Sequence, residues 1–134
     1  MKNQLEHLSS DKGGITLWAV IVVAALFVTI GLIVDGSAMI NAYQRANSIA
    51  REAARVAGQQ VIPAAPAGDA VVLDPYAAQT AGLAYLATAG CDGGTITIVG
   101  GTIDATCPYH YTTIFLPGNY HATGTGNATP LWVR

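Results

Sequence analysis

The chain has 134 residues, of which 10% are charged and 51% are hydrophobic, and its mean hydropathy is +0.40. Soluble domains usually contain about 25% charged residues. Six Lys and Arg residues against eight Asp and Glu residues give a formal net charge of −2. This balance argues against a nucleic-acid binder, which needs a basic face for phosphates, and against a highly charged disordered tail. It leaves a membrane protein or a small apolar secreted domain.

An uninterrupted apolar segment, ITLWAVIVVAALFVTIGLIV, covers residues 15–34 and contains no charged residue, Asn, Gln or Pro. As a helix it would be about 30 Å long, which matches the hydrocarbon core of a bilayer. Trp18 lies one turn inside, where an interfacial anchor belongs. A buried core helix would carry polar positions on one face, and a signal peptide has a shorter apolar region followed by a cleavage site. The pattern therefore predicts a transmembrane helix over 15–34.

The cationic residues and the cysteines give different indications of orientation. Three arginines, Arg45, Arg51 and Arg55, follow the span, which by the positive-inside rule favours a cytoplasmic location for that side. However, the segment before the span is too short to be a domain, and both cysteines, Cys91 and Cys107, lie far beyond it. A disulfide between them implies an oxidising compartment. We therefore predict a single-pass protein of the cytoplasmic membrane, with its N-terminus inside and its C-terminal domain extracytoplasmic.

A helical extension is predicted over residues 35–62, because Ala, Arg, Gln and Glu favour helix and Pro63 stops it. With the span it gives one helix over 15–61, in which Gly36 is a weak point. Small residues recur along the extension at spacings of three and four, so that another element can approach closely. They are Ala38, Ala42, Ala46, Ala50, Ala54 and Ala57. Two interpretations stay open: this face packs against partner helices, or the chain's own C-terminal domain covers it.

The remaining sequence indicates a linker and then a small extracytoplasmic domain. Residues 63–73 form a linker by their Pro, Ala and Gly content. Asp74 followed by Pro75 is an N-cap signal, and the helix that it starts ends at Gly90. The domain, residues 74–134, then continues as strands.

The strand signals begin with a hairpin formed by residues 95–99 and 102–107 around two glycines. Further strands are predicted over 111–116, 120–129 and 131–134. The expected fold class is therefore α+β: a long N-terminal transmembrane and amphipathic helix, followed by a small helix and an antiparallel β-sheet.

The hairpin register predicts a disulfide between Cys91 and Cys107. Pairing Val99 with Thr102 places Gly94 opposite Cys107, and Cys91 lies three residues earlier in the chain. A zinc pair or a catalytic thiol is less well supported, because neither a CxxC motif nor an adjacent cluster of ligands is present.

The polar residues give no catalytic motif. His110 and His121 lie on adjacent predicted strands, with Asp92 and Asp104 near in sequence, but exposed positions on a β-surface explain them better than a metal or acid–base site. The glycine-rich GTGNA lacks the lysine of a P-loop. We predict that the chain is not an enzyme and needs no cofactor, metal, nucleic acid or small-molecule substrate.

Residues 11–58 resemble the N-terminal segment of the TadE/TadG-like family of tight-adherence (Flp) pilus assembly proteins, most closely the actinobacterial members. The shared features are a charged residue and two glycines before the span (Lys12, Gly13 and Gly14), a Val-Asp-Gly step after it, and the Ala/Arg/Gln helix. The resemblance implies a structural, minor-pilin-like component of a type IV-like pilus for cell adhesion. The implied partners are other pilus or secretion membrane components, pilin-like subunits and the lipid bilayer.

The resemblance also implies a candidate processing site. Prepilin-like members are cut after a glycine that precedes the apolar run, which here places the cut between Gly14 and Ile15. They carry glutamate at the fifth mature position, whereas this chain has Ala19 there. This departure favours an uncleaved anchor, in which residues 1–14 stay as a short cytoplasmic segment rather than a leader.

An alternative function is a membrane-tethered extracytoplasmic module that binds a surface polymer or an envelope partner. Its candidate contacts are aromatic residues that would have to be exposed together, namely Tyr109, Tyr111, Tyr120 and Trp132. Aromatic side chains turned toward the helices would count against it.

Overall fold

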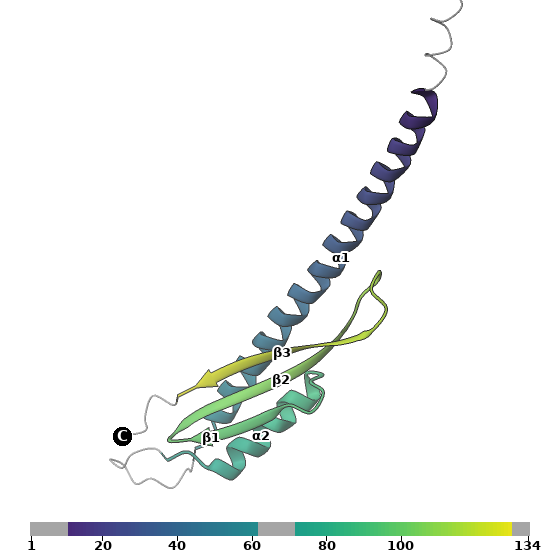
Figure 1. Cartoon of the computed structure of the whole chain (residues 1–134). Coiled ribbons are helices and arrows are strands. Elements are labelled where there is room, and N and C mark those ends of the chain that lie inside the picture. The colour runs from purple at the N-terminus through teal and green to yellow at the C-terminus, as the bar shows by residue number, and fades with distance from the viewer. Residues whose placement is uncertain (1–10, 62–71, 130–134) are drawn as a thin grey trace, which may run out of the picture.

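The computed structural model describes residues 11–61 and 72–129, and in this part of the chain one long helix carries a small sheet and a second helix (Figure 1). The strands form one antiparallel sheet in the order β1-β2-β3. The predicted α+β class is confirmed. The elements are α1 (Asp11–Gly58), α2 (Pro75–Thr88), β1 (Thr95–Val99), β2 (Thr102–Thr112) and β3 (Asn119–Ala128).

Helix α1 is continuous from the apolar span into the sheet domain, and Gly36 does not interrupt it. It ends at Gly58, three residues before the predicted end. The amides of Gln59 and Gln60 bond three residues back, to the carbonyls of Val56 and Ala57, and Val61 pairs with Leu73 in an isolated bridge. The helix therefore ends before Pro63, and the chain continues into this turn and bridge.

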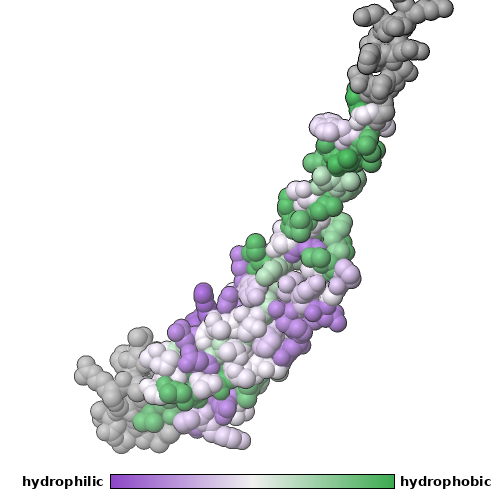
Figure 2. Space-filling model, in the orientation of Figure 1, coloured by the Kyte–Doolittle hydropathy of each residue, from purple (hydrophilic) through white to green (hydrophobic). Residues whose placement is uncertain are grey.

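The first half of α1 projects beyond the rest of the domain, as Figure 1 shows. Its large apolar side chains are exposed, for example Trp18 at 68% and Phe27 at 68%. Figure 2 shows hydrophobic residues gathered along this part of the helix and hydrophilic residues over the sheet. Within the described residues this segment is therefore not a buried core helix. One long apolar helix near the N-terminus fits a single-pass membrane anchor.

The second half of α1 and helix α2 cover the same face of the sheet, so the domain has two layers. Buried side chains from both helices and from strands β1 and β2 form the main core. Its members are Ile49, Ala50, Ala53, Ala54, Ala57, Ala78, Leu86, Ile96, Ile103, Ala105 and Cys107.

Helix α2 begins as its sequence predicts. The Asp74 carboxylate accepts hydrogen bonds from the amides of Tyr76 and Ala77 at 3.0 Å each, and Pro75 occupies the first turn. The helix ends at Thr88, and Gly90 follows with a φ of +88°, which glycine adopts without strain.

The first hairpin has the predicted register, with Val99 opposite Thr102. Gly100 and Gly101 both have positive φ, as a tight two-residue turn between twisted strands requires.

The second hairpin differs from the prediction. Strand β2 continues to Thr112, and residues 113–118 form the loop to β3, so the strand predicted over 111–116 is correct for residues 111 and 112, as the end of β2, and wrong for 113–116. The reason is that the amides of Ile114, Phe115 and Leu116 bond a side chain of α1 and not a neighbouring strand. Strand β3 confirms most of the strand predicted over 120–129. The strand predicted over 131–134 and most of the linker predicted over 63–73 lie outside the described residues.

The stripe of alanines on α1 is covered by the chain's own sheet and α2. Five of its members are buried, at 0–4% exposure: Ala42, Ala46, Ala50, Ala54 and Ala57. Ala38, nearer the span, is only partly buried. Small side chains do allow a close approach, but the element that approaches is mainly β3. The expectation that these five alanines pack against a partner helix is therefore corrected, because their surface is already used within the chain.

Candidate functional site

The most distinctive polar group of the described chain is Asp35, the first residue after the apolar span. Its side chain lies against the β2–β3 loop (residues 113–118), and the residue is only 4% exposed. Oδ1 accepts a hydrogen bond from the amide of Ile114 at 2.9 Å, and Oδ2 accepts one from the amide of Leu116 at 2.9 Å. The amide of Phe115 lies between the two oxygens, at 3.3 and 3.2 Å. One carboxylate thus binds three consecutive backbone amides.

These contacts determine the protonation of Asp35. Burial raises the pKa of its carboxyl group, whereas the hydrogen bonds from the amides of Ile114, Phe115 and Leu116 lower it. The amides prevail, and the pKa lies below its ordinary value. Asp35 is therefore ionised at neutral pH, and its charge is distributed over hydrogen bonds with the loop backbone.

The loop held by Asp35 carries an exposed apolar tip. Ile114, Phe115 and Leu116 are 79%, 58% and 49% exposed. The Phe115 ring packs against Gly31 of α1, where an added Cβ would lie 3.1 Å from the ring. Gly31 belongs to the apolar span, so the loop contacts α1 on both sides of the predicted membrane boundary.

Two tyrosines lie directly below the tip, one on each strand of the hairpin. Tyr111 of β2 is opposite Tyr120 of β3, and their rings stack with centroids 5.8 Å apart. With Leu32, Met39 and other residues they line a groove of about 390 Å³ between the hairpin and α1. The groove is mainly apolar, so this junction is a hydrophobic site and not a polar pocket.

The seam between α1 and β3 depends on glycine. A Cβ at Gly124 would overlap the backbone of Ala46, and one at Gly126 would overlap the backbone of Ala50 and Arg51. In addition, Asn47 Oδ1 accepts a hydrogen bond from the amide of Thr125 at 3.0 Å. Because β3 is an edge strand, this bond occupies one of the amides that the sheet edge would otherwise expose.

The two histidines on the sheet do not form a metal site. His110 and His121 are opposite each other in the register, with ring centroids 5.4 Å apart. His121 Nδ1 lies 3.8 Å from the Asp92 carboxylate, and His110 Nε2 lies 3.4 Å from Asn119 Oδ1. Both histidines are exposed, and within residues 11–61 and 72–129 no group of three or more such ligands is close enough to hold a metal ion.

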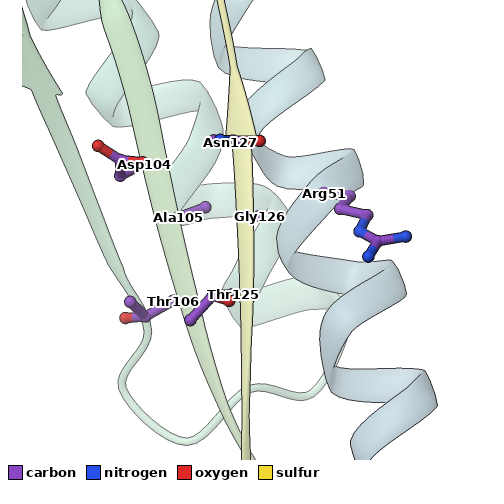
Figure 3. Close-up of a pocket in the computed structure, with 7 residues that line it drawn as sticks. All are labelled: Arg51, Asp104, Ala105, Thr106, Thr125, Gly126 and Asn127. Carbon is purple, nitrogen blue, oxygen red and sulfur yellow. The ribbon is translucent and has the colours of Figure 1, made fainter.

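A shallow hollow on the sheet also lacks convergent chemistry. It has a volume of about 330 Å³ and is lined by Asp104 and Asn127, by two threonines, and by Arg51 of α1. Figure 3 shows the Arg51 guanidinium pointing away from the strands, and Asp104 on the opposite side of the sheet. An acid and a base that point apart do not act on one substrate.

The predicted disulfide is present. Cys91 and Cys107 are bonded, with their Cα atoms 5.3 Å apart. Cys107 is fully buried in the core, and the bond ties the segment after α2 to the middle of β2. It is therefore a structural cross-link of the small domain.

The tyrosines named as candidate contacts of a binding module lie on the helix-facing side of the sheet. Tyr109 packs on the core cluster, with the Arg45 guanidinium 5.5 Å from its ring centroid. Tyr111 and Tyr120 line the groove along α1. Trp132 lies outside the described residues. This arrangement counts against a shared aromatic binding face.

Sequence reasoning did not identify the roles of Asp35, Asn47, Gly124 and Gly126. A signal was present for the two glycines, because a Gly-x-Gly strand and an alanine stripe are complementary when helix and strand pack closely. Asp35 marked the end of the span, but nothing nearby in sequence indicated its partner. The first amide that it binds, that of Ile114, lies 79 residues further along the chain.

Comparison with known protein families gives a match to the first part of the chain. Residues 13–55 match the sequence model of the family described as TadE-like protein. No curated protein and no solved structure matches the chain. The matched segment contains the apolar span, Asp35 and most of the alanine stripe, and it ends in the last turn of α1. The chain is thus similar to TadE-like proteins over its anchor helix, which contains Gly31 and Asp35 but not the loop that contacts them.

Proposed function

We propose that this chain is a membrane-anchored, minor-pilin-like structural component of tight-adherence (Flp) pilus assembly, of the kind found in actinobacteria. The observation that carries the proposal is that the segment similar to TadE-like proteins is the anchor helix itself. That helix holds a disulfide-bonded domain directly against its second half. An apolar span with a rigidly seated small domain suits a protein that contacts other membrane-anchored subunits.

The proposed orientation places the N-terminus in the cytoplasm and the sheet domain outside the cytoplasmic membrane. The bond between Cys91 and Cys107 supports this orientation, because disulfides persist in oxidising compartments. The three arginines after the span lie on the part of α1 that carries the domain. The positive-inside rule applies mainly to short loops, whereas whole domains are translocated largely regardless of their charge.

We also propose that the anchor is retained without cleavage. Ala19 replaces the glutamate expected five residues after Gly14, and α1 runs through Gly14 and Ile15 without a break. The intact mass of the protein extracted from membranes tests this proposal. A full-length mass is expected, whereas loss of residues 1–14 would contradict it. The same measurement with and without reductant shows whether Cys91 and Cys107 are joined in a disulfide or are free thiols.

The open face of the sheet is the surface proposed to contact pilus components. The alanine stripe is occupied within the chain, while the opposite side of the sheet carries no helix of the described residues. Exposed residues of this face are mainly small and polar: Thr95, Thr97, Asp104, Thr123, Thr125 and Asn127. Such a surface suits reversible contacts between folded subunits better than permanent burial.

Photo-cross-linking in cells tests the proposed function. A photoreactive amino acid at Thr123 is expected to capture pilin-like subunits or other pilus assembly components, identified by mass spectrometry. The matched control carries the same group at Tyr76 of α2, which is also exposed but lies on the other layer. Deletion of the gene should remove or shorten the pili. Normal pili in the deletion strain, with no pilus component captured from Thr123, would refute the proposal.

A further inference from the structure

We propose that the β2–β3 loop is a second membrane contact, in which Ile114, Phe115 and Leu116 insert into the phospholipid leaflet next to α1. The site is the exposed apolar tip described above, and its ligand is the lipid of the same bilayer that holds the span. The inference depends on α1 as a membrane anchor and is independent of any role in a pilus.

The level of the tip along α1 is the first argument. Phe115 packs on Gly31, which precedes the end of the apolar span, and the loop amides bond Asp35 just after it. The four residue steps from Gly31 to Asp35 correspond to about 6 Å of helix rise. The tip therefore lies beside the last turn of the span, and Figure 1 shows the loop rising along α1 beyond the sheet. A bilayer around residues 15–34 would also surround the tip.

The polar groups of the loop are the second argument. Backbone outside a helix or a closed barrel is tolerated at membrane depth only when its amides and carbonyls have partners within the protein. Here the amides of Ile114, Phe115 and Leu116 all bond Asp35. The next residue, Pro117, has no amide hydrogen. The carbonyl of Leu116 accepts a hydrogen bond from the Thr113 hydroxyl.

The outward surface is the third argument. With its amides bound by Asp35, the tip presents three large apolar side chains, of which Ile114 is 79% exposed. An exposed cluster of this kind costs free energy in water, whereas burial of the same side chains in a leaflet is favourable. The cluster is continuous with the exposed apolar surface of α1, which includes Leu32 and Ile33. Tyr111 and Tyr120 lie next along the hairpin, where aromatic residues favour the headgroup region.

Fluorescence quenching in vesicles tests the proposal with the full chain. The reporter is Ile114→Trp in a protein with Trp18→Phe and Trp132→Phe, reconstituted in phosphatidylcholine and phosphatidylglycerol. Ile114 is exposed, so the larger ring does not disturb the core. The matched control is Tyr76→Trp in the same background, because Tyr76 is 81% exposed on α2. Quenchers are phosphatidylcholine brominated near the start of its acyl chains, and aqueous acrylamide.

We expect brominated lipid to quench the reporter at position 114 several times more strongly than the control at position 76, and acrylamide to give the reverse order. Asp35→Asn should shift the reporter at 114 toward acrylamide, because the loop is then released. Quenching by acrylamide equal to that of the control would overturn the proposal. Protection from both quenchers would also overturn it, since a second protein copy would then cover the tip. A third protein that keeps only Trp18 shows separately whether the span itself is in the bilayer.

Discussion

Gly124 of β3 lies against the backbone of Ala46 in α1, so closely that a Cβ at position 124 would overlap the Ala46 carbonyl group. Gly126 has the same relation to Ala50, one helical turn further along. Two glycines and two alanines thus let a strand and a helix approach with almost no side chain between them. The position of the whole sheet on the anchor helix depends on this contact.

The first prediction concerns this seam. Gly124→Ala should destabilise the domain by about 3 kcal/mol, the upper end of the usual cost of overpacking, because the added methyl meets backbone that cannot turn aside. Denaturant unfolding of the full chain in detergent micelles, followed by near-UV circular dichroism, measures the change.

Gly36→Ala is the matched control for that substitution. It adds the same methyl group to α1, but nothing lies within 4 Å of the new atom. It should stabilise the helix by up to about 1 kcal/mol, because alanine is the better helix former. Equal effects of the two substitutions on the midpoint would mean that Gly124 is not packed on α1.

The second prediction concerns the disulfide. Cys91→Ser should reduce the stability of the sheet domain by about 3 kcal/mol, which is the loop-closure contribution expected for the segment between Cys91 and Cys107. Membrane insertion should be unchanged. Limited proteolysis of membranes that contain the protein measures the first effect, and carbonate extraction measures the second. Wild-type resistance of the variant to protease would contradict the prediction.

The third prediction concerns the carboxylate that holds the loop. Asp35→Asn keeps the size of the side chain but leaves one oxygen acceptor and turns an NH₂ group toward backbone donors. The amides of Ile114, Phe115 and Leu116 should then exchange with deuterium as fast as those of an open loop, while the amides of β1 keep their protection. Unchanged exchange at all three positions would show that Asp35 does not hold the loop.

The fourth prediction follows from the lowered pKa of Asp35. Burial raises this pKa and the three amides lower it more, to below its ordinary value of 3.8. A group with a lowered pKa stabilises the folded state fully above its unfolded-state pKa, and this contribution is lost as the pH falls through the folded-state pKa. The loop should therefore stay attached from neutral pH down to 3.8 and be released only below it.

The amide resonance of Leu116 in detergent micelles reports this transition. It should shift below pH 3.8 in the wild-type protein and stay constant over the same range in Asp35→Asn. A shift of the wild-type resonance between pH 5 and 7 would contradict the assignment of the transition to this carboxylate.

Local signals predicted most elements of the fold. Asp74 and Pro75 start α2 because a cap and a proline act within one turn, and Gly100 and Gly101 define the first hairpin because a tight turn needs their positive φ. The register of that hairpin then brought Cys107 near Cys91. Each of these relationships depends on residues that are close in sequence.

The relationships that the sequence did not reveal join residues about 80 positions apart. The run YTTIFL has strand propensity, yet its last four residues belong to the loop, because Asp35 binds the amides of the last three. The alanine stripe indicated a close contact, but its partner is decided by the path of β3, which periodicity alone cannot determine. Tertiary hydrogen bonds and packing therefore overrode local preference at the junction.

The continuity of α1 has a mechanical consequence. Because α1 is continuous from the span to the part that carries the sheet, the span and the sheet domain rotate together as one rigid body. Each residue of an α-helix advances about 100° around the axis, so a rotation of the span by that amount would turn the open face of the sheet by more than a quarter of a circle. Torque applied to the sheet domain would likewise be transmitted to the span.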